Sequence, residues 1–325
     1  MVVVLKALIK LIDKNFPFLV PIWLLLGMFL GDLIVDFHAL IPFIFAIVTF
    51  IGALRIDFDS FKQTIRKPKP IILVMLVLRI LMPLWALLLG IIIFPDNLYT
   101  RTGLLLFALI PVGVNSVIWT VMYKGNISLT LSVVLLDTVL SPVVLPFSVL
   151  LLTGASIELN TTSMMLSLLQ MIVIPSIIGM AINQLTKGEL PKKWNAKLSP
   201  VSKLGLLVVV MINGAVVGDY FAIIDLHLVM IMGSIILLAL SGYTMAWNLA
   251  KLLKLSEADM KAAIFSGGSR NVSTGVVIAV AYFSAAVAIP VVVGILFQQL
   301  VCATVAKILE RYYDKRDAEK LRITT

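Results

Sequence analysis

The sequence predicts an all-α integral membrane protein of ten transmembrane helices, arranged as two five-helix repeats of opposite orientation with an interruption in the fourth helix of each. Three observations carry this prediction: the apolar composition, the distribution of lysine and arginine, and a matched pair of glycine- and proline-containing breaks. Of the 325 residues, 61% are hydrophobic and only 13% are charged. Soluble domains are about 25% charged, so most of this chain has too few polar residues to cover a water-facing surface.

Ten apolar segments are long enough to cross about 30 Å of hydrocarbon. Residues 1–16 precede them and carry Lys6, Lys10 and Lys14 at a spacing of four, which places the three charges on one helical face. We expect this part to be a cytoplasmic amphipathic segment that lies along an anionic membrane surface. It lacks the small-residue cleavage site of a removable signal peptide. The ten predicted spans are 17–35, 37–54, 70–94, 102–123, 127–153, 162–186, 204–222, 224–250, 258–284 and 286–309.

The positive charges alternate along these spans. With a cytoplasmic N-terminus, the cytoplasmic segments contain 23 of the 26 lysines and arginines, and the outer loops contain only Arg101. Cytoplasmic loops of membrane proteins are enriched in lysine and arginine, so this split predicts both the number of spans and their orientation. We therefore expect a multi-pass protein of the cell (plasma or inner) membrane with both termini in the cytoplasm. The net charge of +9 is then a topology signal rather than a nucleic-acid-binding surface.

Five spans in each half of the chain predict an inverted repeat, because an odd number of crossings reverses the orientation of the second half. The first repeat is expected at residues 17–153 and comprises spans 1–5. The second repeat is expected at residues 162–309 and comprises spans 6–10. Residues 310–325 are expected to form a cytoplasmic tail.

Both halves are interrupted within their fourth span, by Pro111 and Gly113 in the first half and by Gly267 and Gly268 in the second. Breaks at corresponding positions of two halves are typical of transporters with a site near the bilayer midplane. A single serine or threonine in a membrane helix commonly joins two helices, whereas two polar clusters at matched breaks favour a binding site. These clusters are Asn115, Ser116 and Thr120 in the first half and Asn271, Ser273 and Thr274 in the second.

Three charged residues are predicted near the bilayer centre: Arg79, Asp137 and Arg270. An isolated charge at that depth costs at least about 2.5–3.5 kcal/mol, so each is expected to face the bundle interior with a partner or a water cavity. One interpretation is an Arg–Asp pair that locks helices together. The other is functional, because two arginines and one carboxylate leave one net positive charge that an anionic substrate would neutralise. Protonation of Asp137 beside an arginine would also allow coupling to protons.

Enzymatic and metal chemistry have little support in the sequence. Cys302 is the single cysteine, and His38 and His227 are far apart along the chain. No nucleophile motif, metal-ligand spacing or acid–base pair occurs. We expect no enzymatic activity, no metal centre and no cofactor.

Three stretches of the chain resemble the bile acid:sodium symporter family, within the bile/arsenite/riboflavin transporter superfamily. They are TFIGALRIDFDSFKQTIRKPKP at 49–70, PVGVNSVIWTVMYKGNISLTLSVVLLDTVLSP at 111–142 and FSGGSRNVSTGVVIA at 265–279. The likeness extends over essentially the whole chain. It implies a core domain of spans 3–5 and 8–10, a panel domain of spans 1–2 and 6–7, and fourth and ninth helices that cross at their breaks. Members of this family move organic anions by sodium symport.

The resemblance also implies two sodium sites at the crossover, and here the sequence departs from the family. Ser116 and Thr130 keep two hydroxyl ligands, but the family's crossover glutamate and glutamine fall on Ser266 and Arg270. A hard cation needs several oxygen ligands and is repelled by a guanidinium. We therefore expect none of the usual sodium-binding sets to be intact and sodium not to be required. Polar ligands are also lost at Val117, Val134 and Leu78.

The sequence therefore predicts a secondary transporter that moves a small or amphipathic organic anion, bile-acid-like or carboxylate, by alternating access, with Arg270 in place of a sodium ion. The alternatives are a conventional sodium-coupled symporter, a channel, and an arsenite efflux carrier, which would need a cysteine in the fourth helix. The expected partners are the anion and the lipid bilayer, without nucleic acid, and the oligomeric state is left open, a monomer included. The predicted crossover site comprises Asn115, Ser116, Thr130, Ser266, Arg270, Asn271 and Ser273.

Overall fold

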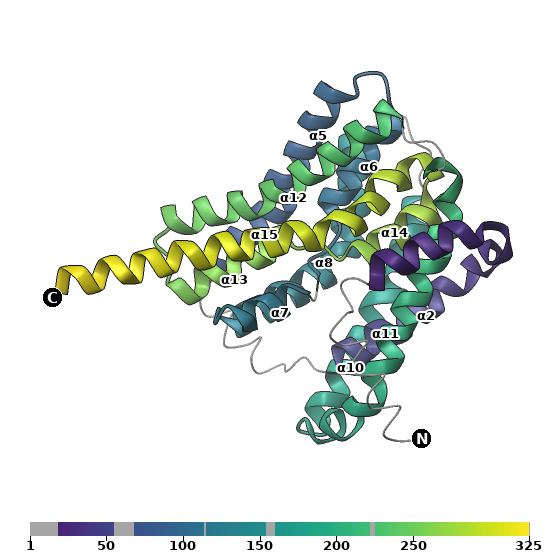
Figure 1. Ribbon diagram of the computed structural model, residues 1–325. Coiled ribbons are helices and arrows are strands. Elements are labelled where there is room, and N and C mark those ends of the chain that lie inside the picture. The colour runs from purple at the N-terminus through teal and green to yellow at the C-terminus, as the bar shows by residue number, and fades with distance from the viewer. Residues whose placement is uncertain (1–18, 55–67, 114, 154–159, 222–224, 325) are drawn as a thin grey trace.

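The computed structural model describes residues 19–54, 68–113, 115–153, 160–221 and 225–324 (Figure 1). Within these ranges the chain is helical apart from turns, loops and an isolated β-bridge, which confirms the all-α class. Seven of the described helices are long and apolar enough to cross a membrane, and three shorter apolar helices accompany them. The chain is thus a multi-pass membrane protein. The predicted amphipathic segment 1–16 lies outside the described residues.

The helices of the first half coincide with the five spans predicted there, to within a few residues at their ends. The first helix covers Leu19–Leu33 and is followed by a short 3-10 helix, η2 (Val35–Leu40). The others are α2 (Ile41–Ala53), α4 (Pro68–Leu76), η3 (Val77–Leu81), α5 (Met82–Ile93), α6 (Leu98–Leu109), α7 (Asn115–Met122) and α8 (Ile127–Thr153).

The helices of the second half extend beyond two of the predicted spans. At about 1.5 Å per residue, the 40 residues of the last helix are about twice as long as the hydrocarbon layer is thick, and in Figure 1 this helix projects from the bundle. The helices are α9 (Thr161–Leu168), η5 (Leu169–Val173), α10 (Ile174–Leu185), α11 (Glu189–Val217), η6 (Gly218–Phe221), α12 (Leu226–Leu252), α13 (Glu257–Gly268), α14 (Val272–Tyr282) and α15 (Ala285–Thr324).

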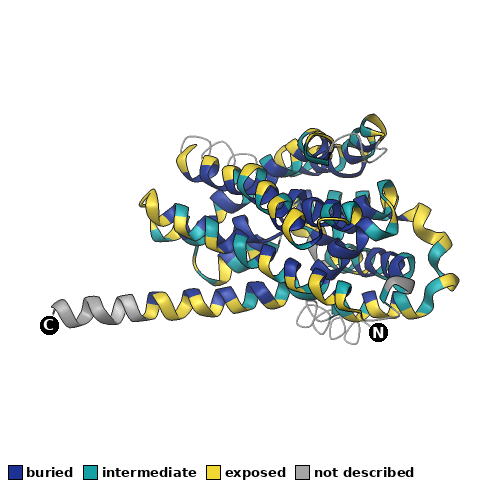
Figure 2. Ribbon diagram, turned by 90° about the horizontal axis from the view of Figure 1, so that it is seen from above, coloured by how far each residue is buried: buried dark blue, intermediate teal, exposed yellow. Residues whose placement is uncertain are grey.

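Large apolar side chains cover the outside of the bundle as well as its interior. Phe29 is 87% exposed, Leu33 77% and Leu151 82%. Figure 2 shows buried positions gathered inside the bundle and exposed ones along its periphery. Exposed leucine and phenylalanine on this scale are expected where lipid, rather than water, is the solvent.

A proline accounts for the irregular turn in the third predicted span. Pro83 has no N–H to donate to the carbonyl of Arg79, four residues earlier, so the regular ladder cannot continue through this point. The chain passes through the π-helical turn η3 instead, and Arg79 lies within it. Single π-helical turns of this kind are frequent at functional sites.

Two groups of helices are visible in Figure 1. In one group α2, α10 and α11 pack against one another, and the first helix lies so close to α11 that a Cβ on Gly214 would be 2.3 Å from the carbonyl oxygen of Leu24. In the other, α6 and α12 pack on α15, α5 packs on α6, and α13 packs on α12. α14 contacts both groups, because it packs on α6 and α15 and also on α2 and α11.

Candidate functional site

The two helix interruptions meet inside the protein. α6 ends at Leu109 and α7 begins at Asn115, while α13 ends at Gly268 and α14 begins at Val272. The extended segments between them run antiparallel to each other over a very short length. We call this meeting point the crossover.

Backbone hydrogen bonds hold the crossover together. Val112 and Arg270 form an antiparallel bridge, and the Asn271 N–H donates to the Pro111 carbonyl at 2.8 Å. The Gly113 N–H donates to the Ser269 carbonyl at 3.3 Å. In a medium without water, each helix break leaves backbone groups that need partners, and here the two breaks satisfy each other.

Glycine is required at one point of this contact. A Cβ on Gly113 would lie 2.7 Å from the carbonyl oxygen of Arg270, and a backbone atom cannot move aside as a flexible side chain can. Pro111 lies in the same extended segment and, lacking an N–H, leaves no unsatisfied donor there. Pro111 and Gly113 thus lie in the interruption between α6 and α7.

The second interruption follows the two glycines that predicted it, because Gly267 and Gly268 belong to the last turn of α13. Their small size serves helix packing instead. A Cβ on Gly268 would lie 2.2 Å from the ring of Tyr243, and one on Gly267 would lie 2.6 Å from the Cβ of Ala246. The two glycines thus bring α13 against α12, and the interruption itself comprises residues 269–271.

Gln298 of α15 forms hydrogen bonds with the backbone of the second break. Its side-chain oxygen accepts the Arg270 N–H at 3.2 Å, and its side-chain nitrogen donates to the Arg270 carbonyl. One amide side chain therefore satisfies both backbone groups of the same unwound residue. The sequence marks Gln298 as a polar residue in an apolar helix, but nothing in the sequence indicates this partner.

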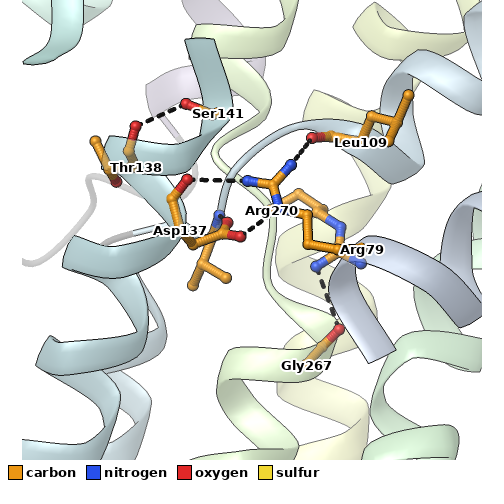
Figure 3. Close-up of polar contacts among 8 residues, drawn as sticks. Arg79, Leu109, Asp137, Thr138, Ser141, Gly267 and Arg270 are labelled. Atoms are coloured by element: carbon orange, nitrogen blue, oxygen red, sulfur yellow. Dashed lines mark hydrogen bonds and ion pairs between the residues drawn. The ribbon is translucent and has the colours of Figure 1, made fainter. Parts of the chain in front are cut away.

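The two predicted charges of the third and fifth spans form a buried ion pair (Figure 3). The Arg79 Nε donates to the Asp137 carboxylate at 2.6 Å, and its two terminal nitrogens donate to the carbonyls of Asp137 and Leu109, each at 2.9 Å. The second carboxylate oxygen of Asp137 accepts the N–H of Val112 at 2.8 Å. Asp137 is fully buried, and each of its two carboxylate oxygens accepts a hydrogen bond from the protein.

Arg270 is the exception among these charges. It is 2% exposed, its Nη1 donates to the Gly267 carbonyl at 3.3 Å, and its Nε and Nη2 have no partner among the described residues. Arg79 and Asp137 neutralise each other, so the charge of Arg270 stays uncompensated in the part of the crossover that the structure describes. The predicted pairing of an arginine with Asp137 therefore involves Arg79, and the Asp137 side chain forms its bonds with Arg79 and Val112.

A chain of hydroxyl groups runs from the crossover along α7 to α8. The Ser116 hydroxyl donates to the Gly113 carbonyl and the Thr120 hydroxyl to the Ser116 carbonyl, both at 2.7 Å. The hydroxyls of Thr120 and Thr130 are 3.0 Å apart. These buried groups already have protein partners, so their evident effect is to join α7 and α8.

The remaining predicted site residues occupy different places around the crossover. Ser266 is buried in α13, and its hydroxyl has no partner among the described residues. Asn271 caps α14 by accepting the Thr274 N–H at 3.4 Å. Asn115 begins α7 and Ser273 lies in the first turn of α14, both of them half-buried.

Interrupted membrane helices that meet around a buried charge define a membrane transporter as the class of this protein. A family model of the Sodium Bile acid symporter family matches residues 41–224, more than half of the chain. The chain therefore belongs to the sodium bile acid symporter family.

Three relatives illustrate the match. The chain is 42% identical to the "Uncharacterized protein YbaS" of Bacillus subtilis (strain 168), over 91% of this chain and 97% of the relative. It is 27% identical to the "Uncharacterized sodium-dependent transporter YocS" of the same organism, over 88% of each chain. It is 24% identical to the "Probable sodium/metabolite cotransporter BASS1, chloroplastic" of Arabidopsis thaliana, over 91% of this chain and 74% of the relative. The family and these named functions are those of transporters, not of enzymes.

Proposed function

We propose that this chain is a secondary transporter that moves a small or amphipathic organic anion by alternating access and does not require sodium. The observation that carries this proposal is the state of Arg270, a fully enclosed arginine at the crossover whose Nε and Nη2 nitrogens are unpartnered among the described residues. A buried guanidinium without a counter-charge is costly, and an anionic substrate removes that cost when it binds.

The geometry of the free donors fits a carboxylate. Nε and Nη2 lie along one edge of the planar guanidinium. Together they present two parallel N–H groups that match the two oxygens of a carboxylate. Nη1, the third nitrogen, is held by the Gly267 carbonyl. The bond to Gly267 thus fixes the side chain while the other edge stays available for an anion.

Sodium is a poor fit beside such a group. The crossover glutamate and glutamine expected from the family are replaced by Ser266 and Arg270, and the nearby carboxylate of Asp137 is already bound by Arg79 and Val112. A guanidinium repels a cation at short range in a medium of low dielectric constant. We propose that the fixed charge of Arg270 takes the place of a mobile sodium ion.

The overall design that goes with this proposal is a pair of inverted repeats, residues 17–153 and 162–309, with both termini in the cytoplasm and the chain in the plasma membrane. The seven long apolar helices and three shorter ones among the described residues, with interruptions after α6 and after α13, support this design. We further propose that α2, α10 and α11 with the first helix form the panel domain. The crossing helices and their neighbours would form the core domain, which moves relative to the panel.

Uptake into proteoliposomes tests the proposed function. Radiolabelled organic anions would be offered with sodium, potassium or choline as the external cation and at matched membrane potential. Equal initial rates in the three salts support the proposal, and strict dependence on sodium overturns it. Saturable uptake that is accelerated by unlabelled anion on the opposite side separates a transporter from a channel.

A conventional sodium-coupled symporter is the second candidate, because two of the relatives carry sodium in their names. In that case the ion would be bound by backbone carbonyls together with Asn115, Ser116, Thr130 and Asn271. Thermal stabilisation of the purified protein by sodium, but not by potassium at the same ionic strength, would favour this candidate.

Proton coupling through Asp137 is a separate question within the first candidate. Both oxygens of that carboxylate already accept hydrogen bonds from the protein, one from Arg79 and the other from the Val112 N–H. We therefore propose uptake without a coupling ion. Uptake driven by an imposed pH gradient, lost in Asp137→Asn, would instead assign the coupling to this carboxylate.

A further inference from the structure

Asn213 of α11 is a polar residue that the crossover does not explain. It is fully buried, and neither the oxygen nor the nitrogen of its side-chain amide has a partner among the described residues. An amide can accept two hydrogen bonds and donate two, and leaving it unpaired in an apolar interior is strongly unfavourable. A buried amide in this state points to a partner beyond the residues that the structure describes.

The packing of α11 shows which way this amide faces. Gly205 of α11 lies against Ile44 and Val48 of α2, and Gly214 lies against Leu24 of the first helix. Successive residues turn by about 100° around a helix, so Asn213 lies on the face between these two contacts and away from lipid. α14 and α15 are the helices that pack on α11 from the other group. The amide is therefore directed at the interface between the two groups of helices.

A second unpartnered group lies on the opposite wall of this interface. Thr274 of α14 is 1% exposed, and its hydroxyl has no partner among the described residues. Val272 lies against α15, and Gly275 lies against α15 and against Ile110, the residue that follows α6. Thr274 is more than 90° from both around the helix, so its hydroxyl faces the other neighbours of α14, which are α11 and α2.

We infer that Asn213 and Thr274 form a second polar subsite, which binds a neutral hydrogen-bonding group of the transported anion, such as a hydroxyl or a carbonyl. This inference rests on the proposed function, because Arg270 supplies the site for the carboxylate. Thr274 follows Arg270 by four residues, so their Cα atoms are at most about 14 Å apart, a separation that the two side chains and one small molecule can span. The substrate class is then an organic anion that carries a neutral polar group several bonds away from its carboxylate.

The position of the subsite also gives it a role in the cycle. Asn213 belongs to the helices proposed as the panel and Thr274 to those proposed as the core. A substrate that bonds to both walls holds the two groups of helices in one relative arrangement. Binding of the neutral group is thus coupled to closure, and an anion that lacks this group would bind to one wall only.

Two matched pairs of probes test this inference: butyrate with 4-hydroxybutyrate, and hexanoate with 6-hydroxyhexanoate. Initial uptake rates would be measured in proteoliposomes for the wild type, Asn213→Leu and Thr274→Val. Asn248→Leu serves as the control, since it removes an amide of the same kind from an exposed position on α12. Rates over a range of concentrations separate KM from kcat.

The wild type and the control are expected to prefer one or both hydroxylated acids over their parent acids by about tenfold or more, because a site with buried polar groups rejects a ligand that leaves them unpaired. Asn213→Leu is expected to abolish this preference through a higher KM for the hydroxylated acid, with little change for the parent acid. It should also unfold at a temperature no lower than the wild type, since it removes an unpaired amide from the interior. Thr274→Val should reduce the preference in the same direction.

Three outcomes overturn the inference. The wild type could take up the parent acids without any preference for the hydroxylated acids. That result contradicts the second subsite and leaves the proposed function intact. The same is true if Asn213→Leu keeps the full preference, as it would if the amide merely held water. Failure of the wild type to take up any of the four acids contradicts the proposed carboxylate transport itself, and the second subsite with it.

Discussion

Asp137 joins Arg79 to the crossover: one carboxylate oxygen accepts the Arg79 Nε at 2.6 Å, while the other accepts the N–H of Val112 at 2.8 Å. Val112 is in turn bridged to Arg270. The ion pair thus sets the position of the unwound segment that carries the proposed anion site.

Replacing Asp137 with alanine is expected to lower the free energy of unfolding by about 3–5 kcal/mol, because a buried arginine is left without its counter-charge. The double variant Arg79→Met/Asp137→Leu should lose much less, since it removes both charges together. Unfolding by sodium dodecyl sulfate in mixed micelles measures both values. Equal losses in the single and double variants would contradict the unpaired charge of Arg79 as the source of the loss.

Gly113→Ala is expected to reduce the initial uptake rate more than tenfold and to lower the free energy of unfolding by about 1–3 kcal/mol. The new Cβ would overlap the Arg270 carbonyl oxygen, and an alanine has no alternative side-chain position that relieves the overlap. Gly233→Ala on α12 is the matched control. A Cβ there meets nothing within 4 Å, so alanine should leave uptake unchanged and raise stability by about 0.5–1 kcal/mol. Uptake by Gly113→Ala at the wild-type rate would contradict the tight crossing of the two segments.

Gln298→Leu is expected to reduce both stability and uptake, since it leaves the N–H and the carbonyl of Arg270 without their side-chain partner. Each unpaired buried group costs about 1–3 kcal/mol. The adjacent Gln299 is half-buried and provides the control substitution Gln299→Leu, which should have little effect. Thermal unfolding in detergent and initial uptake rates would be compared for the two variants. Similar behaviour of both would argue against a stabilising role for the bonds between Gln298 and the Arg270 backbone.

The all-α class and the presence of several membrane-crossing helices were predictable because the hydrocarbon layer imposes a length and a composition on every helix that crosses it. The need of Asp137 for a basic partner was predictable in the same way, from the cost of a charge at that depth. The sequence did not indicate which arginine would be chosen. That choice depends on the π-helical turn before Pro83, which places Arg79 against α8, and on the bond from Val112, which appears only when the two breaks meet.

Two parts of the site were beyond the sequence for a common reason. Gln298 binds the backbone of a residue 28 positions away, and this contact exists only because α15 packs behind α14. Gly267 and Gly268 suggested a helix break, whereas their small size is needed beside Tyr243 and Ala246 of α12. Glycine in a membrane helix is consistent with both a break and a close contact, and only the neighbouring helix distinguishes them.

Substitution of Arg270 tests the exchange of a fixed charge for a mobile one. Arg270→Met is expected to abolish anion uptake at every sodium concentration, because it removes the two N–H groups that would bind the carboxylate. The double variant Ser266→Glu/Arg270→Gln places a carboxylate and an amide where the family has them. We expect it to regain uptake that rises with sodium and not with potassium, since oxygen ligands now replace the guanidinium. Arg101→Gln, near the start of α6, is the control for loss of an arginine elsewhere and should behave as the wild type does. If Arg270→Met transports at the wild-type rate, or if the double variant is active without responding to sodium, the positive charge at the crossover has another role.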